Sequence, residues 1–435
     1  MIGDIDPSQK KVTVIGAGIA GLLAAYELDR KGFEVSLLEA ANRSGGLIQT
    51  SQHEPGISEH AAHSFLATAP VRELCREIGV ELLEVNPGSR ARMVLRAGRM
   101  RRFPLKAGEA IGAFFRAYFK LAPRNPELTV KEWGLHFLGP AATRYLITPF
   151  VAGIYGVRPE DLSVKAAFPA LMVPHGQSLV SFFAVRRLWL RLSGRLPAKS
   201  RGPMVAPRLG MGSIADSLDR HLNARLGSRF RKSEKVTELA GLGGNIVLAV
   251  PAFEAARLLR EEDPSLSEAL SGIVYSSLVS VTAFVRAEDL ERLPKGVGVL
   301  FPSEENRSAL GILFNSSAFA GRVREPREMV SLTLIFSGDW RHQDDTALDQ
   351  AVRRELEALF GFKRGASIDT VIHRYERAIP RYDAKLEKAW QNARAGWCAR
   401  KGHVLFGNYS GQVSLRGMIE DARSLAAGLQ PFEPT

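Results

Sequence analysis

Residues 11–21 read Lys-Val-Thr-Val-Ile-Gly-Ala-Gly-Ile-Ala-Gly, and this stretch decides the fold. Its first part, Lys11–Ile15, is a β-branched run that predicts a buried parallel strand. The following residues predict a helix, and Phe33–Leu38 predicts a second strand that stops at Glu39. This order of strand, helix and strand is typical of the βαβ unit of a Rossmann-type dinucleotide-binding domain.

The three glycines of the GxGxxG turn each have a separate physical reason in that unit. Gly16 permits the tight turn, and Gly18 lets a pyrophosphate approach the backbone. Gly21 allows the helix to pack closely on the strand, and the helix N-terminus attracts the phosphates. Glu39 lies where a carboxylate accepts hydrogen bonds from ribose hydroxyls. Because all these parts occur in the right order, we expect this segment to bind a dinucleotide.

The residues after Glu39 separate FAD from NAD. An arginine and two glycines close to the ribose acid suit a cofactor that continues along the protein past its adenosine half. The segment resembles the corresponding one in flavin-containing amine oxidases, phytoene desaturases and protoporphyrinogen oxidases. That resemblance implies FAD, with Ala40, Arg43, Gly45 and Gly46 in its site.

Two segments in the middle of the chain resemble further parts of such an FAD domain. Lys235–Leu239 resembles the family's adenine-side strand, which implies that the backbone of Val236 faces the adenine. Ile246–Pro251 resembles the strand that follows it. These flavoproteins build the FAD domain from distant pieces of chain, so we expect a discontinuous domain here.

A third segment lies near the C-terminus. Gly407 and Asn408 form a predicted turn before an amphipathic helix over Ile419–Leu429. Backbone N–H groups near such a helix start can bind a phosphate or the flavin pyrimidine. By the same resemblance, Val413 belongs to the cofactor site.

A longer motif indicates one branch of these flavoproteins. Pro149–Pro169 resembles a segment of the protoporphyrinogen oxidase family over about twenty residues, and amine oxidases and desaturases do not share it. Matching segments run in order from about residue 11 to residue 430. The resemblance implies oxidation of protoporphyrinogen IX or coproporphyrinogen III to the porphyrin in haem biosynthesis. It also implies molecular oxygen as the acceptor and hydrogen peroxide as a product.

The same resemblance implies a set of substrate residues. Gly153 falls where a backbone carbonyl faces the reacting macrocycle, and Arg92 falls where an arginine pairs a substrate propionate. Both are therefore expected to take part in catalysis, and Arg92 to bind substrate as well. Val297, Leu300 and Ile335 fall at apolar positions that sandwich the flat ring, although ordinary core residues would look the same.

Composition narrows the other possibilities. The 435 residues include 58 Lys and Arg against 46 Asp and Glu, a formal net charge of +12. Two cysteines cannot form a disulfide framework, and the nine histidines show no metal-ligand spacing, so we expect no metal. The N-terminal residues do not read as a signal peptide, and no run of 18 apolar residues occurs. A cytoplasmic protein is therefore expected.

The basic excess concentrates near large apolar residues. Between Arg186 and Arg201 there are six cations and no acid, and Ile111–Leu121 carries four aromatic residues. Such a composition is typical of an interfacial element on anionic lipid, which predicts a peripheral position on the cytoplasmic face of the membrane. A solvated basic face over a packed aromatic core is the alternative. Nucleic-acid binding is not expected, because no nucleic-acid motif accompanies the charge.

Three departures from the family pattern lie near the expected flavin. Glu59–Phe65 has Ala61 and Ala62 where the family has Gly-Pro, and Gln412 replaces a glycine. The loop between Leu239 and Ile246 is about six residues, where the family inserts a hairpin. Two other hypotheses therefore remain open: a degenerate relative that carries flavin or porphyrin or assists assembly, and an FAD-dependent polyprenoid or carotenoid desaturase. A homodimer also remains open.

The expected architecture is α/β (α+β). A Rossmann-type FAD-binding domain is assembled from residues 1–85, 205–260 and 385–435. A mixed-sheet substrate domain covers 261–384, where Val279–Val285 and Met329–Phe336 read as strands. A helical, membrane-facing insert covers 86–204.

Overall fold

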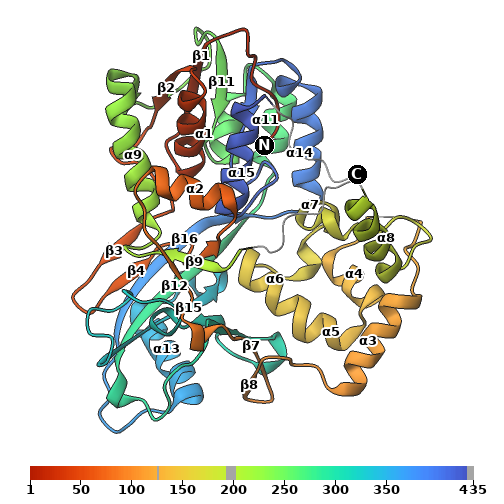
Figure 1. Ribbon diagram of the computed structural model, residues 1–435, viewed down its shortest axis with the longest axis vertical. Helices are drawn as coiled ribbons and strands as arrows, with labels where there is room; N and C mark the ends of the chain where they lie inside the picture. The colour runs from red at the N-terminus through yellow and green to blue at the C-terminus, as the bar shows by residue number, and fades with distance from the viewer. Residues whose placement is uncertain (125–126, 193–201, 429–435) are drawn as a thin grey trace.

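A parallel five-stranded sheet carries the N-terminal motif in the computed structural model, which describes residues 1–124, 127–192 and 202–428 (Figure 1). Its strands come from three distant parts of the chain. In spatial order they are β10 (Phe230–Arg231), β2 (Glu34–Leu38), β1 (Lys11–Ile15), β11 (Asn245–Leu248) and β17 (His403–Leu405). The predicted discontinuous Rossmann-type domain is thereby confirmed.

Helices cover both faces of this sheet because its strands alternate their apolar side chains between two cores. On β11, Val247 packs into one core, whereas Ile246 and Leu248 pack into the other. The first core is covered by α1 (Ile19–Arg30), α2 (Ala69–Glu77), α9 (Gly212–Leu226) and α15 (Leu415–Ala426). The second is covered by α10 (Ala252–Leu258), α11 (Pro264–Ser271) and α14 (Ala384–Ala395).

A seven-stranded mixed sheet forms the lower part of the molecule in Figure 1. Its spatial order is β16 (Asp369–Pro380), β12 (Tyr275–Arg286), β15 (Met329–Ser337), β14 (Ala309–Leu313), β13 (Gly298–Leu300), β7 (Arg92–Arg96) and β8 (Arg99–Arg101). All neighbours are antiparallel except β13 and β7, which are parallel. Helix α13 (Asp345–Phe360) buries one face, so the opposite face is available for a ligand.

A helical region lies beside the open face of this sheet (Figure 1). It contains α3 (Ala107–Phe119), α4 (Val130–Phe137), α5 (Pro140–Ala142), a π-helical turn at Thr143–Ile147, α6 (Thr148–Tyr155), α7 (Val164–Ala167) and α8 (Leu179–Leu192). The short helix α12 (Asn315–Ala318) follows β14.

Two small sheets connect these parts. One pairs β3 (Thr50–Gln52) with β4 (Ile57–Glu59), and the other has the order β5 (Phe65–Leu66), β9 (Met204–Pro207), β6 (Leu82–Glu84). Both lie between the parallel sheet and the mixed sheet, where the segment after the dinucleotide motif crosses from one to the other.

The structure confirms the strands predicted at Lys11–Ile15, Val279–Val285 and Met329–Phe336. Two local predictions were wrong. Lys235–Leu239 contains no strand, because only Phe230 and Arg231, just before it, pair with β2. The last helix begins at Leu415 rather than Ile419, since Ser414 accepts the N–H of Gly417 as its N-cap.

The region 86–204 is helical only from α3 onward. Strands β7 and β8 precede the helices and extend the mixed sheet. Of the basic stretch 186–201, residues 193–201 lie outside the described part of the chain.

Candidate functional site

The GxGxxG turn has one glycine with free space beside it and two without. A Cβ on Gly21 would overlap the carbonyl oxygen of Gly16, and a Cβ on Gly16 would lie 2.8 Å from the carbonyl oxygen of Ala249. A Cβ on Gly18 would meet nothing within 4 Å. Gly16 and Gly21 are therefore required by packing, whereas the space at Gly18 fits a pyrophosphate at the N-terminus of α1.

Glu39 ends β2 beside this turn. Its carboxylate accepts the backbone N–H of Ala17 at 2.6 Å and that of Ala41 at 2.8 Å. Each carboxylate oxygen keeps a further lone pair, so the group can still accept ribose hydroxyls. Ala40 is exposed between these residues. The site therefore fits the adenosine half of a dinucleotide.

The chain after β10 runs alongside Glu39. The N–H of Glu39 donates to the carbonyl of Arg231, and the N–H of Glu234 donates back to the carbonyl of Glu39. Val236 follows this contact, and its own carbonyl accepts the guanidinium of Arg257 at 2.7 Å. The segment thus lies beside the ribose acid, as the resemblance implies, although it is not a strand.

The two glycines after Arg43 close the other side of the turn. Gly45 and Gly46 have φ values of +94° and +60°, and the N–H of Gly45 donates to the carbonyl of Ala17. A Cβ on Gly46 would lie 3.3 Å from the Cα of Gly18. Arg43 is exposed and forms no ion pair with any described residue, so its charge remains available to a phosphate.

Helix α15 begins at the same edge of the parallel sheet as α1. Both helices follow parallel strands, β17 and β1, so both N-termini lie at the carboxyl edge of the sheet, and the two helices pack side by side (Figure 1). The Gly407–Asn408 turn leads to α15, and Tyr382 fixes it by donating its hydroxyl to the carbonyl of Asn408 at 2.6 Å. Val413, just before the helix, is half-buried.

Gln412, one of the departures, lies against the first turn of this helix. A Cβ on Gly417 would overlap the Oε1 of Gln412, so the Gln412 side chain rests on the N-terminal turn. It thus occupies part of the space through which a flavin would approach those N–H groups.

The open face of the mixed sheet carries a continuous row of paired residues. Leu300 on β13 pairs with Gly311 on β14, which pairs with Ile335 on β15. Ile335 pairs with Ser280 on β12, which pairs with His373 on β16. Directly paired residues point to the same face of a sheet. The structure thereby brings the predicted Leu300 and Ile335 together, with no side chain on the glycine between them.

Gly153 approaches this row from α6. A Cβ on Gly153 would lie 2.8 Å from the Cδ2 of Leu300, and Gly153 itself is exposed. The backbone of α6 therefore lies against the sheet face, and this close approach requires that residue 153 has no side chain.

Arg92 lies at the end of the same face. It pairs with Gly298 on β13, two residues before Leu300, and its side chain is exposed. Its guanidinium donates to the Sδ of Met204 at 3.3 Å and forms no ion pair with the described residues. Val297, just before β13, donates its N–H to the carbonyl of Ala91 beside Arg92, and it lines a small cavity with Leu313. The structure thus brings Arg92, Leu300 and Ile335 to one sheet face with Gly153 against it, and Val297 lies next to the Arg92 end of that face.

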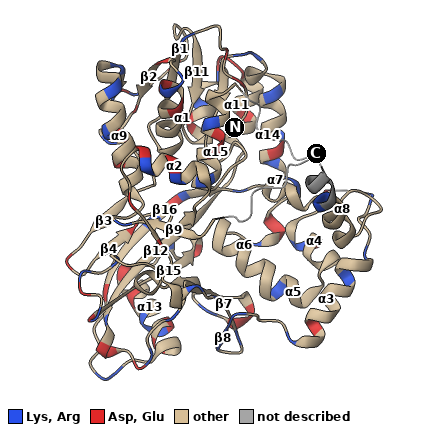
Figure 2. Cartoon of the chain, viewed as in Figure 1, with Lys and Arg blue, Asp and Glu red and all other residues tan. Residues whose placement is uncertain are grey.

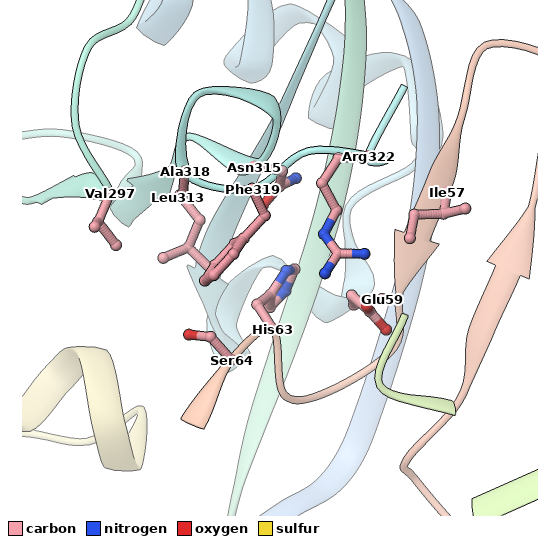
Figure 3. Close-up of a pocket in the computed structure, with 10 residues that line it drawn as sticks. All are labelled: Ile57, Glu59, His63, Ser64, Val297, Leu313, Asn315, Ala318, Phe319 and Arg322. Atoms are coloured by element: carbon pink, nitrogen blue, oxygen red, sulfur yellow. The ribbon is translucent and has the colours of Figure 1, made fainter. Parts of the chain in front are cut away.

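The small cavity collects buried polar groups (Figure 3). It measures about 20 Å³, room for one water molecule. Arg322 is 3% exposed and donates to the carbonyls of Pro207 and Arg208, while the Nε2 of His63 is buried without a partner among the described residues. Burial, with the charge of Arg322 adding, lowers the pKa of His63 to about 4. This imidazole is therefore neutral at pH 7.

Glu59 balances Arg322 in this cavity. It is 3% exposed and accepts the hydroxyl of Thr50 at 2.6 Å and the N–H of Met211 at 2.9 Å. Burial raises the pKa of Glu59, and these hydrogen bonds and Arg322 oppose the rise. The segment Glu59–Phe65 is thus fixed by buried polar contacts and not by the Gly-Pro pair of the family.

A pair of histidines, His60 and His373, joins this segment to the mixed sheet. The rings of His60 and His373 stack at 3.9 Å between centroids, and the Nε2 of His60 lies 2.7 Å from the hydroxyl of Ser51. Burial, helped by His60 and His53, lowers the pKa of His373 to about 4. Two neutral imidazoles can stack, whereas two imidazolium ions would repel each other.

Sequence reasoning missed His373, Arg322 and Asn315. His373 lies in a strand without any local motif, and only the pairing of β16 with β12 brings it to the site. Asn315 donates to the hydroxyls of Ser331 and Thr333. For Asn315, the one available signal in the sequence was that it is a polar residue next to an apolar strand run. That signal does not tell which distant residues the side chain will contact.

Helix α3 carries an exposed aromatic surface. Phe114, Phe115, Tyr118 and Phe119 are each at least half exposed, so these side chains do not form the packed aromatic core of the alternative interpretation. Within the described ranges, no helix has the length and apolarity to cross a bilayer.

Comparisons with known proteins agree with this geometry. A model of flavin containing amine oxidoreductases matches residues 19–427. The chloroplastic protoporphyrinogen oxidase of Nicotiana tabacum is 27% identical over 477 residues, covering 96% of this chain and 85% of that protein. The coproporphyrinogen III oxidase of Propionibacterium freudenreichii is 25% identical over 492 residues, covering 97% and 91%. A solved Exiguobacterium structure, provisionally assigned as a protoporphyrinogen oxidase, has a TM-score of 0.73 at 19% identity, covering 97% and 98%.

Proposed function

Because the chain belongs to the flavin containing amine oxidoreductase family and is an FAD-dependent oxidoreductase, we propose that it oxidises a porphyrinogen to the porphyrin. The substrate is protoporphyrinogen IX or coproporphyrinogen III, molecular oxygen is the acceptor, and hydrogen peroxide is released. The names and coverage of the relatives support a porphyrinogen in preference to an amine.

One observation carries the proposal: an apolar row on the open sheet face, in contact with the backbone of α6, ends at an arginine that forms no ion pair with the described residues. Leu300 and Ile335 form the apolar row, and Gly153 provides that backbone. A porphyrinogen is a broad apolar ring with carboxylates at its edge, so it needs both kinds of surface at once. Arg92 supplies the second kind.

The residues divide the work as follows. FAD, when bound, supplies the two-electron oxidation, and the protein positions the ring against it. Leu300 and Ile335 exclude water from one side of the ring, while Arg92 holds a propionate and fixes the ring's rotation. Gly153 leaves the α6 backbone close enough for its carbonyl to face the reacting carbon.

The proposed division of the chain follows from these roles. The FAD domain comprises 1–85, 205–260 and 385–435, the substrate domain 261–384 and the insert 86–204. Within the insert, β7 contributes Arg92 to the substrate face and the helices contribute Gly153.

A peripheral membrane position belongs to the same proposal. Helix α3, which carries the exposed aromatic residues, packs against α8, which carries the cations Arg186 and Arg187. Aromatic residues with flanking cations bind an anionic lipid surface, which would give access to a poorly soluble substrate. We place this contact at the cytoplasmic face.

A direct assay tests the proposal. Purified protein loaded with FAD is incubated aerobically with each porphyrinogen, and porphyrin fluorescence and hydrogen peroxide are followed. Formation of porphyrin at a rate proportional to enzyme supports the proposal. Flavin-loaded protein that oxidises neither porphyrinogen faster than air alone would refute it, and oxidation of a carotenoid precursor instead would favour a desaturase.

A further inference from the structure

We call the open face of the mixed sheet that carries Leu300 and Ile335 the substrate face. An open groove lies at its end, and three arginines line this groove. Its walls are Pro87, Gly88, Arg90, Ala91, Arg92 and Arg102. The strands β7 and β8 beside it carry four arginines, and Figure 2 shows blue segments in this hairpin. Only Arg92 is assigned a role by the proposed function, on which the following inference rests.

The three groove arginines have no acidic partner among the described residues, unlike two other arginines near them. Arg96 forms an ion pair with Glu109 at 2.6 Å, and Arg144 forms one with Glu304 at 2.8 Å. Arg90, Arg92 and Arg102 form no ion pair with an acid of the described ranges. Three guanidinium groups without counter-ions around one groove repel one another unless anions fill it.

A neighbouring acid is not free to neutralise them. Glu305 faces the same hairpin, but its two carboxylate oxygens accept the backbone N–H groups of Ala97 and Gly98, at 2.7 and 3.0 Å. This contact fixes the β7–β8 turn and uses both carboxylate oxygens of Glu305. The arrangement keeps the cations in place for a ligand from outside.

The groove adjoins the apolar row through Arg92. Arg92 shares the face of Leu300, and Val94, which pairs with Leu300, pairs in turn with Arg101 on β8. Arg101 therefore shares the face of Leu300, and Arg102, the next residue along the chain, lines the groove together with Arg92. A flat ring lying on Leu300 would bring its carboxylate-bearing edge to the groove.

We propose that this groove recognises two neighbouring propionates as a unit. Arg92 binds one carboxylate, and Arg102, together with Arg90, binds the second. A single propionate would leave two of the three charges without a partner. The groove would thus select porphyrinogens in which two propionates flank the same bridging carbon.

This selection can be tested with two isomers of equal charge and composition. In coproporphyrinogen III one bridging carbon lies between two propionates, whereas in coproporphyrinogen I propionates and methyls alternate and no bridge has such a pair. Both isomers offer the same apolar ring to Leu300 and Ile335. Only the pairing of carboxylates differs.

The experiment measures kcat/KM of the FAD-loaded protein for both isomers, in wild type, Arg102→Gln and the control Arg99→Gln. Arg99 lies on the same hairpin and carries the same charge but does not line the groove. We expect the wild type to prefer isomer III by about tenfold or more. Arg102→Gln should lower kcat/KM for isomer III by a similar factor and leave isomer I nearly unchanged, while Arg99→Gln keeps the preference.

Equal rates of the wild type with the two isomers would overturn the inference, and so would a preference that survives Arg102→Gln. If Arg102→Gln instead weakens binding to vesicles of anionic phospholipid and keeps the isomer preference, the groove serves a lipid phosphate and the inference is wrong. If neither isomer is oxidised, the proposed function fails. Binding of the two porphyrin isomers, followed by quenching of protein fluorescence, then still decides whether the groove distinguishes them.

Discussion

Gly153 of α6 lies directly against Leu300 of β13, so that a Cβ on Gly153 would come to 2.8 Å from the Cδ2 of Leu300. The contact joins the helical region to the face of the mixed sheet. In the proposed function, the ring lies on that face beside this contact. Any atom added at residue 153 therefore displaces Leu300 into the ring's place.

Gly153→Ala should raise KM for the porphyrinogen about fivefold or more and leave the melting temperature almost unchanged, because the tip of Leu300 is flexible and Gly153 is exposed. The double variant Gly153→Ala with Leu300→Ala should recover part of this loss, because the smaller side chain removes the overlap. Steady-state kinetics of the two single variants and the double variant measure this coupling. Purely additive effects would show that the two residues do not act on a common ligand.

The glycine turn offers a matched pair of variants for the cofactor. Gly18→Ala should fold normally, because φ of −62° suits alanine and the new Cβ meets nothing within 4 Å, but it should weaken FAD binding by about tenfold or more. Gly21→Ala should instead destabilise the apoprotein, because its Cβ overlaps the carbonyl oxygen of Gly16. Titration with FAD and thermal unfolding of the apoproteins separate these effects. Normal FAD affinity of Gly18→Ala would remove the pyrophosphate from this turn.

The histidine pair predicts a pH dependence of stability. The pKa of His373 is lowered to about 4 in the folded protein, so the unfolded chain binds more protons between pH 4 and 6.5. The stability that the neutral imidazole allows is complete above pH 6.5 and decreases as the pH falls toward 4. His373→Gln should reduce this loss of unfolding free energy by about 1 kcal/mol at pH 5. The effect is no larger because the side chain is only partly buried.

Urea unfolding at pH 5 and pH 7.5 measures that difference. His342 provides the control, since it lies in the loop after β15 and takes no part in the stack. An identical pH dependence in wild type and His373→Gln would contradict the pKa assignment.

Gln412 predicts a gain of function. Its side chain rests on the first turn of α15 beside Gly417. Gln412→Gly should free this turn and strengthen FAD binding about threefold or more, because backbone N–H groups at a helix N-terminus then reach the cofactor. Equilibrium titration of the apoprotein with FAD checks this. A weaker complex would show that Gln412 itself contacts the cofactor.

The aromatic surface of α3 predicts lipid binding. Replacing Phe115 and Phe119 with serine should lower binding to vesicles containing anionic phospholipid by about tenfold, because both side chains are exposed and apolar. Leu209→Ser is the control, since Leu209 is 68% exposed but belongs to the turn before α9. Vesicle co-sedimentation measures the effect, and equal losses in both variants would exclude a specific membrane face.

The local patterns of the sequence were enough to predict the glycine-rich turn that binds the cofactor. Strand, glycines and Glu39 all lie within thirty residues, so their roles depend on chain-local geometry that the sequence determines directly. The resemblance added Leu300, Ile335, Gly153 and Arg92, which the fold then places on one face.

The rest depended on long-range pairing. Val297 precedes β13 and lines the small cavity, a position that depends on the pairing of β13 with β7 and β14. The stack of His60 on His373 joins residues more than three hundred positions apart, and Arg322 is buried by the carbonyls of a distant loop. No local periodicity encodes such contacts, because they arise only when the two sheets meet.

Anaerobic mixing of the FAD-loaded protein with coproporphyrinogen III or protoporphyrinogen IX is the decisive measurement of whether the protein oxidises a porphyrinogen through its flavin. We expect the flavin absorbance at about 450 nm to bleach as porphyrin fluorescence appears, and admission of oxygen to restore the flavin colour with formation of hydrogen peroxide. Flavin that stays oxidised in the presence of both porphyrinogens would contradict the proposed function.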